Sequence, residues 1–134
     1  MTPDSLAHAR ALLAHVMAEV LREDTLTPLK DAIVALVKSE GTPTLAAVAR
    51  LPGASGHKAL TMTGKNVVLW DGLSWDAISA VTELQIEGRV RIVPTHLLVY
   101  FAEGEALRLP LATSNRAFKS PRWLPVVLAA GASS

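Results

Sequence analysis

The sequence predicts a mixed α+β fold, and three observations lead to this prediction. In residues 74–101 the spacing of apolar residues changes from a helical period to a strand period. Half of all residues are apolar, and they are mostly Ala, Leu and Val with few aromatics, which favours helices with some strand. The length of 134 residues suits one domain with a core of its own. We therefore expect a single domain over residues 1–134.

Residues 6–23 contain neither glycine nor proline and predict the first helix. An apolar stripe runs along it and is made by Leu6, Leu13, Val16, Met17 and Val20. Such a stripe must be covered, either by the rest of its own domain or by a second subunit. The second alternative predicts a homodimer in which residues 1–25 form the dimerisation helix.

Two shorter helices are predicted next. Thr27-Pro28 marks a helix start, with threonine as the cap and proline at the first helical position, and Gly41 marks its end. Leu45–Leu51 predicts the next helix, which Pro52-Gly53 ends. Two helices joined by a glycine-containing turn are typical of the first part of a helix-turn-helix.

Residues 52–72 interrupt this helical pattern. Leu60–Thr63 can form a strand, and Val67–Trp70 is the stronger candidate because turn residues bound it on both sides. The segment is either an inserted hairpin or the source of a third strand for a later sheet. We favour the third strand.

The stretch from residue 74 to residue 88 predicts the best-defined helix of the chain. Ile78, Val81 and Leu84 recur at helical spacing, and Gly88 supplies the stop. At 100° per residue, Ala77 and Gln85 fall on the same side as these three residues, so we expect this side to face the core.

A hairpin is predicted directly after this helix. Val90 and Ile92 alternate with Arg89 and Arg91, so one face of the strand is apolar and the other basic. A short turn at residues 94–96 then leads to a run of β-branched and aromatic residues, 97–101, which predicts the second strand.

This order of helix, glycine, basic strand, turn and apolar strand resembles the winged helix-turn-helix superfamily over residues 27–101. The resemblance implies that helix 74–87 enters the major groove of DNA and that the wing, residues 89–101, lies near the backbone or minor groove. The expected fold is therefore a winged helix-turn-helix with an added N-terminal helix and a C-terminal strand and tail, residues 102–134. Within that tail, leucines alternate with other residues over positions 107–111. This alternation predicts an edge strand, which Pro110 keeps short.

The charge pattern suggests where DNA would be contacted. The chain carries 13 basic and 12 acidic residues, so bulk charge does not drive binding. Residues 50–134, however, hold 9 basic against 6 acidic residues, so a polyanion should meet this half. The expected contacts to double-stranded DNA are Ser74, Arg89, Arg91, His96, Arg116, Lys119 and Arg122. For Arg89 and Arg91 the alternative is that they merely keep an exposed strand soluble.

Helix 74–87 itself has a surface that suits protein better than DNA. No Lys or Arg occurs between Lys65 and Arg89, although a helix in the groove normally brings cations and amides to the duplex. Its outward side is acidic and apolar and comprises Trp75, Asp76, Ser79, Glu83 and Ile86. The alternative function is a protein-interaction module that uses this face. For Trp75 we favour a different interpretation, in which its side chain covers the end of the core against Trp70, and the contact patch with Ile86 is the alternative.

Several functions are not expected. The absence of cysteine excludes disulfides, thiolate metal sites and thiol catalysis, and no catalytic motif is present. We therefore expect no enzyme activity, no cofactor and no metal. The N-terminus lacks the pattern of a signal peptide, and no apolar run approaches the ~20 residues of a membrane span. The sequence predicts a cytoplasmic protein without a membrane partner. The winged-helix resemblance implies that it is a small dimeric regulator of transcription or of another DNA transaction.

Overall fold

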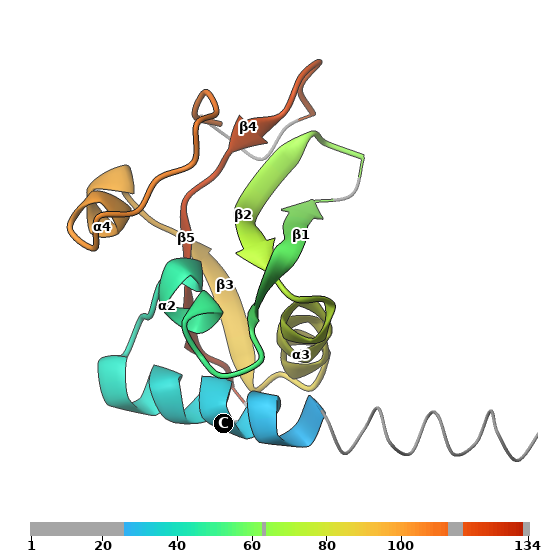
Figure 1. Ribbon diagram of the computed structural model, residues 1–134, viewed down its shortest axis with the longest axis vertical. Coiled ribbons are helices and arrows are strands. Elements are labelled where there is room, and N and C mark those ends of the chain that lie inside the picture. The colour runs from blue at the N-terminus through green and yellow to red at the C-terminus, as the bar shows by residue number, and fades with distance from the viewer. Residues whose placement is uncertain (1–25, 63, 113–116, 133–134) are drawn as a thin grey trace, which may run out of the picture.

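The computed structural model describes residues 26–62, 64–112 and 117–132, and they form a mixed α+β fold, as expected (Figure 1). Helical residues 26–40 come first. The elements that follow are α2 (Leu45–Ala49), β1 (Ser55–Met62), β2 (Val67–Leu73), α3 (Trp75–Ile86), β3 (Val90–Pro94), α4 (Leu97–Phe101), β4 (Arg122–Trp123) and β5 (Val126–Ala130). The strands form one sheet in the order β1-β2-β4 and a second sheet of β3 and β5.

The first described helix buries one face and ends at a glycine. Leu26, Leu29 and Ile33 of this helix are buried in the core. Gly41 has a φ of +82°, and its N–H donates to the carbonyl of Val37 at 2.8 Å, so the predicted stop is confirmed. The predicted start is wrong, because residues 26 and 27 are already helical and Thr27 is not a cap. The dimerisation stripe (Leu6, Leu13, Val16, Met17, Val20) lies outside the described residues.

The predicted strand Val67–Trp70 is present within β2, but it belongs to the first sheet and not to the sheet that contains β3. β1 and β2 form an antiparallel hairpin with irregular register, and β4 runs parallel to β2. Gly56 of β1 lies close against the end of β2, since a Cβ there would meet the Leu73 carbonyl oxygen at 2.7 Å. Residues 52–72 therefore contribute both strands of a hairpin in the first sheet, and none of them joins the sheet of β3. The favoured assignment to the wing sheet is wrong.

Helix α3 agrees with its prediction at both ends. The Ser74 hydroxyl accepts a hydrogen bond from the N–H of Ala77 at 3.0 Å and caps the helix. Gly88 follows the C-terminus with a φ of +73°, and the N–H of Arg89 donates to the Leu84 carbonyl at 2.9 Å. The buried face is Ala77, Ala80, Val81 and Leu84. Gln85, which was expected in this face, is exposed.

The second sheet pairs β3 with the end of the chain. β3 and β5 run antiparallel in uninterrupted register from Val90–Ala130 to Pro94–Val126. On its other side β5 bridges to Thr44, the residue before α2. As predicted, Val90 is buried and Arg91 is exposed.

The predicted second wing strand is wrong, because Leu97–Phe101 is the short helix α4. His96 caps this helix, its Nδ1 accepting from the N–H of Leu98 at 3.2 Å. A five-residue apolar run suits either structure, and here tertiary packing decides. The wholly apolar β5 occupies the place beside β3, while the helix directs Tyr100 into the core. The predicted edge strand at 107–111 is also wrong, since only Leu111 forms a bridge, to Trp123.

An aromatic cluster holds α4 and the first sheet together. The ring centroids of Trp70 and Tyr100 are 5.0 Å apart, and those of Tyr100 and Trp123 are 5.3 Å apart in an edge-to-face arrangement. Trp70 packs against Tyr100 and Trp123, whereas Trp75 is 58% exposed, so the prediction that Trp75 covers the end of the core is wrong. None of the helices in the described part of the chain has the length and apolar character that a membrane crossing requires.

Candidate interaction surfaces

The outer face of α3 presents two large apolar side chains to solvent. Trp75 near the start of the helix is 58% exposed, and Ile86 at its end is 81% exposed. Asp76 and Ser79 are half-buried between them, and Glu83 is exposed. The predicted protein-contact residues therefore do share one accessible face. We call the set Trp75, Asp76, Ser79, Glu83 and Ile86 the α3 outer face.

One lysine from the first described helix meets the acidic end of this face. Lys30 Nζ lies 2.7 Å from a Glu87 carboxylate oxygen and 3.3 Å from a Glu83 carboxylate oxygen. The hydrogen bond from Lys30 holds the pKa of the Glu87 carboxyl below its ordinary value, and the same bond raises the pKa of the Lys30 ammonium. Residues 26–30 and the end of α3 thus form a shallow hollow of mixed polarity beside Ile86.

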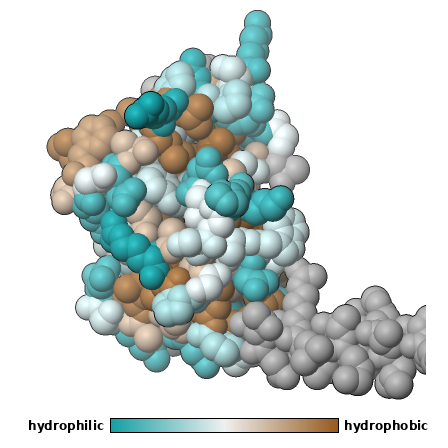
Figure 2. Space-filling view, viewed as in Figure 1, coloured by the Kyte–Doolittle hydropathy of each residue, from teal (hydrophilic) through white to brown (hydrophobic). Residues whose placement is uncertain are grey.

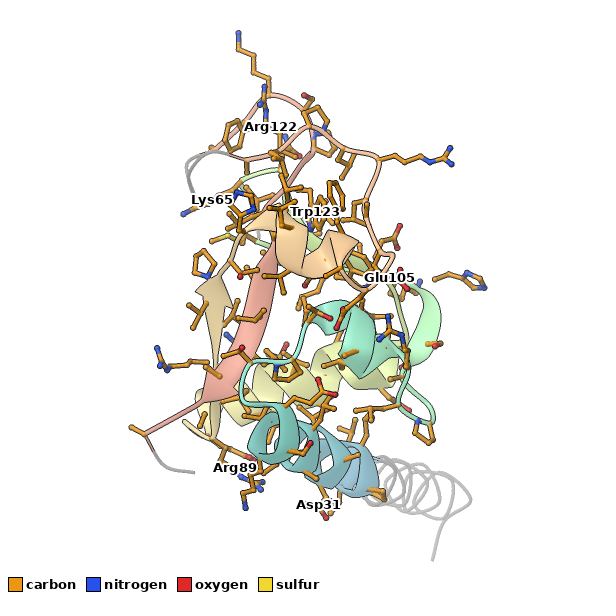
Figure 3. The ribbon with its side chains drawn as sticks, turned by 90° about the vertical axis from the view of Figure 1, so that its left-hand side faces the viewer. Asp31, Lys65, Arg89, Glu105, Arg122 and Trp123 are labelled. Carbon is orange, nitrogen blue, oxygen red and sulfur yellow. The ribbon has the colours of Figure 1, made fainter. Side chains whose placement is uncertain are left out.

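The cations expected to contact DNA do not converge. Figure 3 shows Lys65 and Arg122 near one end of the molecule and Arg89 near the other. The segment with Arg122 is fixed there because its N–H donates to the Asn66 carbonyl at 2.9 Å. Lys119 lies in the same segment and is exposed, whereas Arg116 lies outside the described residues.

Most of these cations also have interactions within the chain. Arg89 Nη1 is 3.7 Å from a Glu87 carboxylate oxygen, and Arg91 Nε donates to the Ala130 carbonyl at 3.2 Å. Arg122 Nη1 donates to the Leu111 carbonyl at 3.2 Å, and its guanidinium lies 4.8 Å from the centre of the Phe118 ring. The Glu87 carboxylate offsets part of the charge of Arg89, whereas the carbonyl hydrogen bonds occupy donors of Arg91 and Arg122 and leave their charges in place.

The two remaining predicted contacts are helix caps. The Ser74 hydroxyl accepts from Ala77 and donates to the Gly53 carbonyl at 2.7 Å, so both of its functions are in use. The His96 ring accepts from Leu98 at the start of α4. Each side chain therefore has a structural role that explains its presence.

Sequence reasoning missed an apolar patch on α4. Leu98, Val99 and Phe101 are 62%, 40% and 51% exposed. Figure 2 shows apolar atoms projecting where Figure 1 places α4. The sequence does contain a signal for this helix, because His96 can cap a helix and only one of the next five residues, 97–101, carries a polar group. The same five residues also suit a strand, which is the structure predicted above.

Sequence reasoning also missed a groove between the two sheets, with a volume of about 510 Å³. It is lined by Leu60, Thr61, Met62, Leu69, Thr82, Gln85, Ile92, Pro94, Leu124 and Val126. These residues come from both sheets and from α3, so no local pattern indicates that they meet. A volume of this size is within the range of ligand-binding pockets.

Within the described ranges, no cluster of three or more His, Asp or Glu side chains is placed to hold a metal ion. Comparison of the chain with family models, with curated proteins and with solved structures found no match.

Proposed function

We propose that this chain is a protein-interaction module built on a winged-helix-like core, and that the α3 outer face is its contact surface. The observation that carries the proposal is the exposure of Trp75 and Ile86 at the two ends of one acidic helix face. Solvent-facing Trp–Ile pairs are typical of interfaces, where aromatic and large apolar side chains supply most of the binding energy.

The arrangement of the second sheet supports the winged-helix part of this proposal. The resemblance expects α3 to be followed by two paired strands with a third strand beside them. β3 and β5 are paired after α3, and Thr44 bridges to β5 on the side away from β3. In this interpretation the wing is the long connection between β3 and β5, residues 95–125, which contains α4.

The electrostatics of α3 argue against duplex DNA as the partner. A helix in the major groove lies among phosphates, and this one would bring Asp76 and Glu83 there. Lys30 offsets part of the charge of Glu83 and Glu87, and among the described residues only Lys30 and Arg89 lie within salt-bridge distance of these two carboxylates. Figure 3 places Lys65 and Arg122 at the end of the molecule opposite Arg89, so these cations do not gather in one patch.

The apolar and acidic residues of the α3 outer face indicate which surface a partner should present. It should offer an apolar pocket for Trp75 or Ile86, with basic side chains that approach Asp76 and Glu83. Truncation of a central aromatic or large apolar residue in such an interface costs about 2 kcal/mol or more, equivalent to a roughly thirtyfold weaker complex.

Site-specific photo-crosslinking in the source cells tests the proposal. A photoreactive residue replaces Glu83 on the α3 outer face, and in a second variant it replaces Val99 on α4. We expect a discrete protein crosslink from position 83, absent from position 99 and lost when Trp75→Ser and Ile86→Ser are added. Equal crosslinking from both positions, or crosslinks that survive the double substitution, would contradict the proposal.

A further inference from the structure

The strand β3 has one open edge. At the two ends of its ladder with β5, the Gly131 N–H donates to the Arg89 carbonyl at 3.0 Å and the Thr95 N–H donates to the Pro125 carbonyl at 2.9 Å. Because hydrogen-bonded pairs alternate along an antiparallel ladder, Ile92 turns its own N–H and C=O away from β5. Within the described ranges no other backbone or side chain is hydrogen-bonded to these two groups.

The groove between the sheets lies along this open edge. Ile92 and Pro94 of β3 line one side, and Leu60, Thr61 and Met62 of β1 line the other. β1 is likewise the outer strand of its sheet, but its register is broken at several points, which makes it a poor template for pairing. An added strand in the groove would therefore pair with β3 rather than with β1.

The groove has an apolar floor and an uncharged rim. Leu60, Leu69 and Val126 are buried at its floor, whereas Thr82 and Gln85 of α3 are exposed at its rim. None of the ten lining residues carries a charge. A charged segment would lose its hydration without gaining a partner, so the lining selects an uncharged occupant.

The backbone chemistry narrows the class of occupant further. A lipid chain or small apolar molecule would fill the floor but leave the Ile92 N–H and C=O without partners. An extended peptide satisfies both, because its own main chain supplies a carbonyl and an N–H at strand spacing. Pro94 has no N–H to donate, so pairing is confined to a few residues around Ile92.

We propose that the groove between β1 and β3 binds a short, extended, uncharged segment of another protein, which adds as a strand to the open edge of β3. Every second side chain of that segment is apolar and occupies the floor formed by Leu60, Leu69 and Val126. This site is independent of the proposed function of the α3 outer face, although α3 contributes to both. Gln85 faces the groove, and Ile86, about 100° further around the helix axis, belongs to the outer face.

Selection from a phage-displayed library of random short peptides tests the proposal. The probes are the selected peptides, synthesised with blocked ends, and the targets are the full chain, Gln85→Arg and the matched control Ile86→Arg. We expect selected peptides with apolar residues at alternate positions that bind the full chain and Ile86→Arg equally. Gln85→Arg should weaken binding by about tenfold or more, because it places a charge at the rim. If Gln85→Arg does not fold, as circular dichroism would show, Thr82→Arg on the same rim replaces it.

Two further measurements identify the binding mode. Hydrogen exchange at the Ile92 amide should slow when the peptide binds, and methylation of the peptide nitrogen that pairs with Ile92 should weaken binding about tenfold or more. The proposal is overturned if no peptide is enriched, if the rim variants bind as well as the full chain, or if the methylated peptide binds undiminished. Loss of binding in Ile86→Arg alone would place the peptide on the α3 outer face and also overturn it.

Discussion

The Tyr100 hydroxyl donates a hydrogen bond to the main-chain carbonyl of Val126. The same hydroxyl accepts from the N–H of Leu45 at 3.1 Å, so it lies between the backbone of α2 and that of β5. Leu45 and Val126 are the neighbours of Thr44 and Val127, which form an isolated β-bridge. The Tyr100 hydroxyl therefore links the two backbones at the next pair of residues after this bridge. Through this atom α4 is joined to both neighbouring elements.

Tyr100→Phe should destabilise the fold. The substitution retains the ring and its contacts with Trp70 and Trp123, but it leaves the buried Leu45 N–H and Val126 C=O without a partner. An unsatisfied buried group costs about 1–3 kcal/mol, and we expect a loss of that size in the free energy of unfolding. Urea denaturation measures it. A variant as stable as the natural protein would show that the hydroxyl is not needed.

Stability should also fall at high pH. Burial raises the pKa of Tyr100 to about 12, above its ordinary value of 10.0. The unfolded chain therefore loses this proton first, so the contribution is complete below pH 10 and is lost between about pH 10 and 12. A shift of this size corresponds to about 2–3 kcal/mol. Tyr100 is the only tyrosine in the chain, so tyrosinate absorbance reports its ionisation directly, and Tyr100→Phe is the control that lacks this component.

Ser74→Ala should weaken the start of α3. The variant removes the cap for the Ala77 N–H and the donor to the Gly53 carbonyl. Loss of a serine cap typically costs about 1 kcal/mol, and asparagine can replace the cap function. In thermal or urea unfolding, Ser74→Asn should therefore retain more stability than Ser74→Ala. Equal stabilities of the two variants would show that the cap contributes little.

Lys30→Ala should change the titration of Glu87. The hydrogen bond from Lys30 is the largest cause of the low pKa of this carboxyl, so its removal should raise that pKa toward the ordinary value of 4.5. Carbon NMR titration of the glutamate side chains measures the change. Lys38→Ala is a matched control on the same helix and should leave the Glu87 titration unchanged. An unaltered pKa in Lys30→Ala would contradict the ion pair.

Local signals determined α3, and this part of the fold could be predicted. Cap, helical spacing and glycine stop all lie within residues 74–88, and the accessible positions of Trp75 and Ile86 follow from the helical period. The run Leu97–Phe101 could not be assigned in this way, because its five residues suit a strand or a helix. Its outcome depends on Val126–Ala130, which pairs with β3 from far along the chain.

The candidate surfaces also differ in whether local sequence or contacts between distant segments determine them. The α3 outer face comes from one helix and was predictable, whereas the groove requires β1, β3 and α3 to meet. The failed convergence of Arg89 and Arg122 has a similar origin, since hydrogen bonds between residues 118–122 and the turn at 65–66 fix where the tail lies. No spacing in the sequence indicates that contact.

A titration of mixed-sequence duplex DNA by fluorescence anisotropy separates protein recognition from DNA recognition with purified components. It compares the full chain, Arg89→Ala/Arg91→Ala and Trp75→Ser/Ile86→Ser at about 20 mM and about 200 mM salt. If the α3 outer face is a protein-contact surface, no saturable binding should appear at the higher salt, and residual binding at the lower salt should not depend on Trp75 or Ile86. Saturable, salt-sensitive binding that disappears in Arg89→Ala/Arg91→Ala would instead show that the strand after Gly88 contacts phosphates and that the chain is a DNA-binding protein.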